Sequence, residues 1–171
     1  MDRQGTSGGL AITSGIPPVF PAYATVVVPE PEMPDEQQAR DRALLDVLAR
    51  HSTQERWWLG YLETGGSDVV FADAPRVGLY AGGGWRYVLV SAGPEQAARW
   101  RSPDPWKGCL PDLMFPADRS WLVSTLWDDD WTCVGGSEQL IADLLSHPDL
   151  LAHARRVTVD EDATPPGHKA I

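Results

Sequence analysis

Residues 115–145 read FPADRSWLVSTLWDDDWTCVGGSEQLIADLL, and no other part of the chain indicates its structure so clearly. Ser120 to Trp127 is rich in Trp, Val, Thr and Leu, whose side chains pack well on a pleated surface. Trp131 to Val134 repeats this composition after three consecutive aspartates, which favour a turn. The pattern therefore predicts a β-hairpin with an acidic tip.

A helix is predicted directly after this hairpin. Gly135 and Gly136 release the backbone from strand geometry, and Ser137 stands where an N-cap residue accepts a hydrogen bond from a helix amide. Four apolar residues then recur at helical spacing, namely Leu140, Ile141, Leu144 and Leu145. We therefore expect strand, turn, strand and helix in this order.

Two further helices are predicted earlier in the chain. Asp35 can cap an amphipathic helix that runs to Arg50, because apolar residues recur there at three- and four-residue intervals. Pro94 to Trp100 is expected to form a short helix, since proline is tolerated in a first helical turn. Arg56 to Thr64 is aromatic but too short for its period to separate helix from strand.

The remaining strands are predicted from short apolar runs bounded by glycine or proline. Ala24 to Val28, which lies between prolines, is expected as an edge strand. The other predicted strands are Asp68 to Ala72, Val77 to Ala81, Trp85 to Val90 and Val157 to Val159. A second hairpin is expected where glycines join two of these strands, and Ser102 to Pro116 is expected to be an ordered, proline-rich connection.

The length of 171 residues and a hydrophobic share of 43% predict one domain with a substantial core. We expect a flexible N-terminal arm over residues 1–15, a single α+β domain over 16–160 and a C-terminal tail over 161–171. Apolar runs do not reach signal-peptide length or the roughly 18 residues of a membrane helix, so a cytoplasmic protein is expected. In that compartment Cys109 and Cys133 are expected to be free thiols.

The net charge of −10 narrows the classes of partner. Nucleic acid is not expected, because phosphate neutralisation needs a basic stripe and none is visible. A basic protein partner is compatible with this charge. The alternative is that the acidic surface simply keeps the protein soluble.

Candidate partner-binding residues lie at the acidic hairpin tip, namely Trp127, Asp128, Asp129, Asp130 and Trp131. The aspartates would steer a cationic surface, and the tryptophans would supply contact area. A solvated turn is the alternative interpretation. A metal is not expected, because calcium needs about six to eight oxygen ligands spread over a loop. The second candidate surface is the glycine tip Gly82, Gly83 and Gly84, which could enter a cleft of the partner.

Motifs for catalysis or cofactor binding are not found in the sequence. His147 and His153 are six residues apart, unlike a helical zinc pair, and no nucleophile signature such as GxSxG occurs. We therefore expect no catalytic residue, no metal and no cofactor. A small enzyme of unrecognised type stays an alternative, because dispersed catalytic residues cannot be recognised in one sequence. A scaffold subunit of a secretion or regulatory assembly is the third possibility.

The segment WLVSTLWDDDWTCVGGSEQLIADLL, residues 121–145, resembles the late hairpin and final helix of the SUKH superfamily of bacterial immunity proteins. The earlier helix, an aromatic segment closing in Thr64-Gly65-Gly66, and the strands that follow are similar to that group in their order. The resemblance implies an α+β domain with a central, mostly antiparallel sheet flanked by helices. It also implies a non-catalytic antitoxin that binds and occludes the active site of a cognate secreted toxin domain. The charge agrees with this, because an acidic inhibitor can compete for a positively charged active site.

Overall fold

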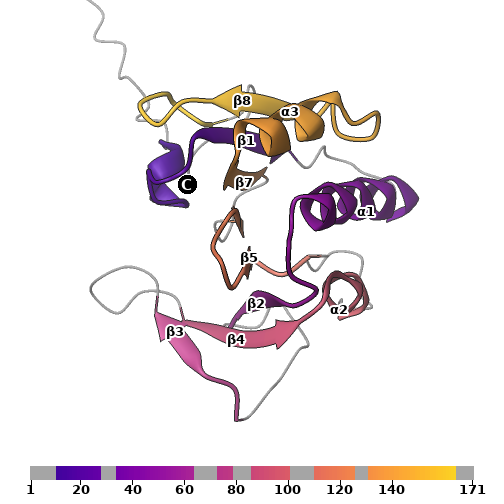
Figure 1. Ribbon diagram of the computed structural model, residues 1–171, viewed down its shortest axis with the longest axis vertical. Helices are drawn as coiled ribbons and strands as arrows, with labels where there is room; N and C mark the ends of the chain where they lie inside the picture. The colour runs from indigo at the N-terminus through magenta and orange to yellow at the C-terminus, as the bar shows by residue number, and fades with distance from the viewer. Residues whose placement is uncertain are drawn as a thin grey trace, which may run out of the picture.

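The computed structural model describes residues 11–27, 34–63, 73–78, 86–100, 110–125 and 131–164. Within these ranges the chain forms one antiparallel sheet of eight strands in the order β3-β4-β2-β5-β6-β7-β1-β8 (Figure 1). The strands are β1 Ala22–Val27, β2 Trp57–Leu62, β3 Arg76–Gly78, β4 Arg86–Ala92, β5 Leu113–Pro116, β6 Leu122–Thr125, β7 Trp131–Gly136 and β8 Ala154–Val157. The helices are α1 Pro34–Arg50, α2 Pro94–Arg99 and α3 Glu138–Ser146, and a 3-10 turn, η1, spans Ile12–Ser14. The expected α+β fold, with an antiparallel sheet flanked by helices, is confirmed.

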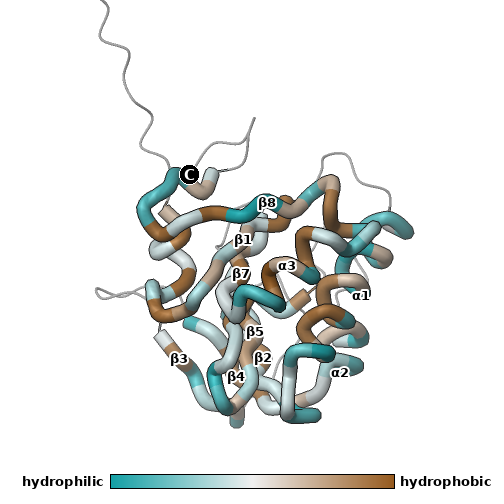
Figure 2. Tube along the Cα trace, turned by 45° about the horizontal axis from the view of Figure 1, so that its top comes forward, coloured by the Kyte–Doolittle hydropathy of each residue, from teal (hydrophilic) through white to brown (hydrophobic). Residues whose placement is uncertain are grey.

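The three helices pack against one face of the sheet, and Figure 1 shows α1 and α2 to the right of the strands. In β2, Trp57, Leu59 and Tyr61 point to this face, because alternate residues of a strand share a side. The apolar residues that α1 and α3 contribute to the same core include Leu44, Val47, Leu48, Leu140, Ile141 and Leu144. Figure 2 shows hydrophobic stretches alternating with hydrophilic ones along α1 and α3, which is the pattern of amphipathic helices.

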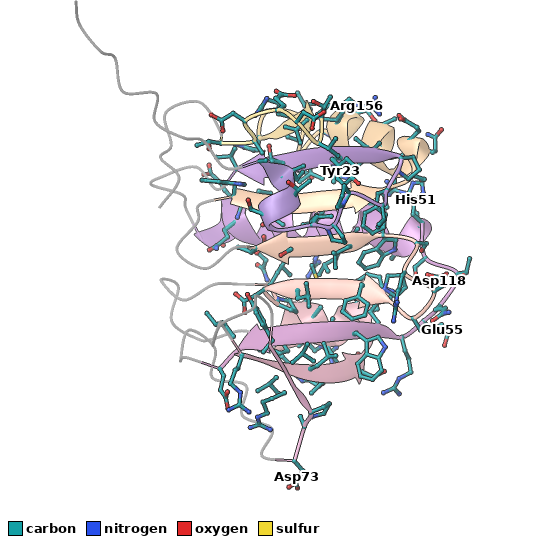
Figure 3. All side chains as sticks on the ribbon, turned by 90° about the vertical axis from the view of Figure 1, so that its left-hand side faces the viewer. Tyr23, His51, Glu55, Asp73, Asp118 and Arg156 are labelled. Atoms are coloured by element: carbon teal, nitrogen blue, oxygen red, sulfur yellow. The ribbon has the colours of Figure 1, made fainter. Side chains whose placement is uncertain are left out.

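The opposite face is covered at one side of the sheet by segments near the two chain ends, and Figure 3 shows η1 in front of these strands. A second apolar cluster lies here, formed by Ile12, Ile16, Tyr23, Trp131, Cys133, Val157 and Ala163. Ala11 forms an isolated β-bridge with Asp162, and Arg155 Nη2 donates to the carbonyl oxygen of Asp162 at 3.1 Å. The packed domain therefore extends beyond the expected limits of residues 16 and 160 at both ends.

The hairpin and helix predicted from residues 115–145 are confirmed. β6 and β7 pair with Leu122 opposite Gly135, and Ser137 Oγ accepts a hydrogen bond from Leu140 N at 3.1 Å. Gly135 and Gly136 do not leave the strand, however, since they are the last two residues of β7. A Cβ atom at Gly135 would lie 2.6 Å from Cδ2 of Phe20. Close packing against the segment before β1 is therefore the reason for glycine at this position.

Three strands differ from the expectation based on sequence. β1 lies between β7 and β8 rather than at an edge, and the outer strands of the described sheet are β3 and β8. β5 forms inside the proline-rich connection, and β8 begins at Ala154, three residues before the predicted start. Each of these strands is stabilised by partners distant in sequence, so local composition does not determine its place.

Several other predictions are resolved. α1 and α2 are confirmed, and the aromatic segment after α1 is the strand β2. β3 and β4 pair antiparallel as the predicted second hairpin. Cys133 is a buried thiol that is not in a disulfide. The predicted strand Asp68 to Ala72, the turn at Thr64 and Cys109 lie outside the described residues.

Candidate functional site

A surface groove of about 470 Å³ opens where the end of α1, the start of β2 and the junction of β4 with α2 meet. Its lining residues are Ala49, Ser52, Thr53, Gln54, Glu55, Trp57, Gly93, Pro94, Glu95 and Gln96. Figure 3 labels His51, Glu55 and Asp118 at this same end of the sheet. The groove is thus built from two segments about forty residues apart that only the sheet brings together.

The first wall is the short loop that connects α1 to β2. Ser52 Oγ donates a hydrogen bond to the carbonyl oxygen of Gln54 at 2.9 Å and accepts one from Trp57 Nε1 at 3.0 Å. The Trp57 ring packs edge-on against Trp121, with ring centroids 4.8 Å apart and an interplanar angle of 87°. This wall is therefore held by a buried aromatic pair and by the Ser52 hydroxyl group, which both donates and accepts a hydrogen bond.

The second wall is the first turn of α2. Gln96 Oε1 accepts a hydrogen bond from Gly93 N at 3.0 Å, which fixes the amide side chain at the rim. A Cβ atom at Gly93 would lie 3.2 Å from the carbonyl oxygen of Glu55. The two walls therefore approach each other closely at Gly93, where a larger residue would push them apart.

Two further contacts tie the first wall to the rest of the fold. Thr53 Oγ1 donates to Asp118 Oδ2 at 3.0 Å, and His51 Nε2 lies 2.7 Å from Asp143 Oδ2 on α3. Hydrogen bonds from Ser120, and a weaker contribution from Thr53, lower the pKa of the Asp118 carboxyl group. Hydrogen bonds from His51 and Gln139 lower the pKa of Asp143 in the same way. Both aspartates are therefore held as carboxylates at neutral pH.

The lining of the groove carries negative charge and hydrogen-bond acceptors. Glu55 and Glu95 are exposed carboxylates, and none of the ten lining residues is Lys, Arg or His. Arg99 lies 4.0 Å from Glu95, but these two side chains are 77% and 79% exposed, so the pair is weak. Ser52 donates to a main-chain carbonyl rather than to a histidine or carboxylate, so it lacks the base that activates a serine nucleophile. The arrangement suits binding of a cationic group.

A second polar group lies at the opposite end of β2. Leu62 N donates to Asp112 Oδ2 at 2.8 Å, and burial nevertheless raises the pKa of the Asp112 carboxyl group. Burial, with a smaller effect of the Asp112 charge, also raises the pKa of the Tyr61 hydroxyl group. The Tyr61 hydroxyl is buried and has no hydrogen-bond partner among the described residues. These groups lie away from the groove and bear on stability.

The site residues predicted from sequence lie elsewhere. Trp131 is only 2% exposed and packs in the second apolar cluster, so it does not offer contact area to a partner. This corrects its expected place at the recognition tip. The cause is tertiary packing, because this cluster also holds residues remote in sequence such as Ile12, Ile16 and Tyr23. Trp127, Asp128, Asp129 and Asp130, and the glycines Gly82, Gly83 and Gly84, lie outside the described residues.

The groove is not recognisable in the sequence, because its residues form no motif. Serine, threonine, glutamine and glutamate after a helix are typical of any solvated loop, and Gly93-Pro94 is typical of a helix start. The one hint in the sequence of where this wall forms is the pair Trp57 and Trp121, because two such large rings are expected to pack in the core.

Among the side chains that the structure describes, no three His, Cys, Asp or Glu residues are placed to hold a metal ion. In the described ranges, no helix has both the length and the apolar character needed to cross a membrane. Comparison of the chain with protein-family models, with curated proteins and with solved structures gives no match.

Proposed function

We propose that this protein is a non-catalytic binding protein of the antitoxin type, which occludes the active site of a cognate secreted toxin domain in the cytoplasm. The observation that carries the proposal is the groove lining, which combines two exposed carboxylates with hydrogen-bond acceptors and contains no basic side chain. Such a surface is complementary to a cationic protein surface, and charge complementarity raises both the rate and the specificity of association.

The charge of the whole chain supports the same class of partner. Asp and Glu total 24 against 14 Lys and Arg, so a cationic partner is attracted from a distance as well as at the groove. The predicted hairpin tip at Asp128, Asp129 and Asp130 would add to this attraction. The resemblance of residues 121–145 to bacterial immunity proteins favours inhibition over simple attachment.

The proposal is tested with the full-length protein by capture and neutralisation. The tagged protein is exposed to a lysate of its source organism at low salt, and a stoichiometric partner is purified and assayed for toxicity with and without the protein. Neutralisation that fails in a Glu55→Lys/Glu95→Lys variant supports the proposal. The matched control is Glu36→Lys/Asp46→Lys, which makes the same charge change at two exposed carboxylates on α1.

A second set of variants separates the two candidate surfaces. Reversal of Asp128, Asp129 and Asp130 to lysine tests the hairpin tip independently of the groove. If neither set of variants changes neutralisation, the acidic surfaces are not the binding site. Capture of no toxic partner, or retention of full toxicity in the complex, would contradict the antitoxin function itself.

A further inference from the structure

We infer that the groove is a subsite for the guanidinium group of an arginine side chain presented by the partner protein. The arginine's source rests on the proposed function, whereas the affinity of the groove for a guanidinium group is a property of this chain alone. The volume of about 470 Å³ lies within the range of roughly 300–1,000 Å³ that is typical of ligand pockets. A long side chain therefore fits without rearrangement of the walls.

The chemistry of the groove matches arginine better than other residues. Glu55 and Glu95 lie on opposite walls, and a guanidinium group presents five N–H donors in a planar fork that suits carboxylates. Its apolar stem would lie along Pro94, which is half-buried in the lining, while the Trp57 ring, 1% exposed, only backs this surface. A lysine ammonium group is a compact, strongly hydrated point charge and cannot form the two parallel hydrogen bonds of a guanidinium group.

The arginines that the structure describes do not line the groove. Arg56, next to Glu55 in the chain, donates from Nη2 to the carbonyl oxygen of Ser91 at 2.6 Å. Glu55 forms no ion pair with another residue of the described ranges, while Glu95 has only the exposed contact with Arg99. A guanidinium group from outside the chain would thus meet at least one uncompensated carboxylate.

The walls of the groove are already in place before a ligand arrives. The hydroxyl of Ser52, the indole N–H of Trp57 and the amide of Gln96 are each held by a hydrogen bond within the protein. The walls therefore keep their shape on binding, and the side chains that lose entropy are mainly the exposed carboxylates of Glu55 and Glu95. A weak but specific interaction with a single arginine side chain is therefore measurable in isolation.

The test is a titration of the ¹⁵N-labelled full-length protein with N-acetyl-arginine amide, followed by the chemical shifts of the backbone amides. We expect saturable, salt-sensitive shifts that are concentrated at residues 52–57 and 93–97. N-acetyl-citrulline amide has nearly the same shape without the charge and should bind about tenfold more weakly or not at all. N-acetyl-lysine amide should also bind more weakly than the arginine compound.

Variants decide whether the shifts report this groove. Glu55→Gln/Glu95→Gln should weaken binding of the arginine compound by about tenfold, and the remote control Glu36→Gln should not. Gln54→Lys places a competing cation in the groove and should also weaken binding of the arginine compound. This variant tests the groove without removing either glutamate. Shifts spread evenly over the surface, equal binding of citrulline, or unchanged binding by both groove variants would each overturn the inference.

The two proposals fail in different ways. If the arginine compound binds in the groove but no toxic partner is neutralised, the subsite stands and the antitoxin function does not. If a toxin is neutralised but the groove does not bind the arginine compound, the function stands and the subsite does not.

Discussion

Thr53 Oγ1 donates a hydrogen bond to Asp118 Oδ2 at 3.0 Å, and this contact joins two residues that are 65 positions apart. It links the loop after α1, which forms one wall of the groove, to the turn between β5 and β6. Asp118 Oδ1 also accepts a hydrogen bond from Ser120 N at 3.0 Å, which fixes the turn itself. The position of the groove wall therefore depends on an exposed carboxylate that titrates in acid.

We expect this contact to make part of the stability depend on pH. The hydrogen bonds from Ser120 and Thr53 lower the pKa of Asp118 in the folded state. Its contribution is then present above the ordinary aspartate pKa of about 3.9 and is lost as the pH falls through the lowered value. Urea unfolding of Asp118→Ala should show a loss at neutral pH that shrinks in acid. The matched control is Asp46→Ala on the exposed side of α1, and an equal loss at every pH would contradict the prediction.

Arg119 in the same turn has a φ of 56°, in the left-handed region that L-amino acids rarely adopt. Because glycine adopts this region without a steric penalty, Arg119→Gly should raise the free energy of unfolding by up to about 1 kcal/mol. Arg119→Ala keeps the penalty and should not stabilise the protein. Urea unfolding measures both, and equal stabilisation by the two substitutions would show that loss of the arginine charge is the cause.

Gly135→Ala should destabilise the protein by about 1–3 kcal/mol, because its Cβ would lie 2.6 Å from Cδ2 of Phe20 and 3.1 Å from Cγ2 of buried Ile16. Gly78→Ala is the control in another strand, since no atom lies within 4 Å of a Cβ built there. Thermal unfolding of the double variant Gly135→Ala/Phe20→Ala adds a further check. If the clash is the cause, the two effects will be less than additive.

Asp112→Asn should stabilise the protein increasingly as the pH rises, whereas Asp118→Ala should destabilise it increasingly. Burial raises the pKa of Asp112, so the protonated form favours folding and that advantage is lost as the pH rises through the raised value. The asparagine side chain stays neutral and still offers an oxygen to Leu62 N. Denaturant unfolding from pH 4 to pH 8, in steps of about one unit, should therefore show a benefit of the substitution that grows with pH. A benefit that is constant over this range would contradict the assignment.

The sequence predicted the elements with strong local signals. α1 has acidic residues in its first turn and a clear helical period, although Asp35, expected as its cap, lies inside the helix. The segment from β6 to α3 contains two strand-like runs and the N-cap Ser137. β5 was not predicted, because it lies next to prolines and becomes a strand only through pairing with β2 and β6. The central place of β1 was missed for the same reason, since β7 and β8 come much later in the chain.

The candidate site was harder to predict than the fold. Trp131 has the same local sequence signal as an exposed aromatic anchor, and only its tertiary packing in the second apolar cluster makes it a core residue. Glu55 and Glu95 belong to no motif in the sequence. They line one groove only because β2 and β4 pair and bring the neighbouring loops together. A groove that forms between segments distant in sequence cannot be predicted from local sequence patterns.

The place of β1 in the sheet has a consequence for how the protein folds during its synthesis on the ribosome. β1 is synthesised before both of its neighbours, β7 and β8, which follow it by more than a hundred residues. During that interval a strand with apolar residues on both sides has no hydrogen-bonding partner. Pairings of such long sequence separation form slowly, and β1 joins the sheet only after β7 and β8 have been synthesised. Chaperones that shield nascent strands therefore have a defined target in residues 22–27.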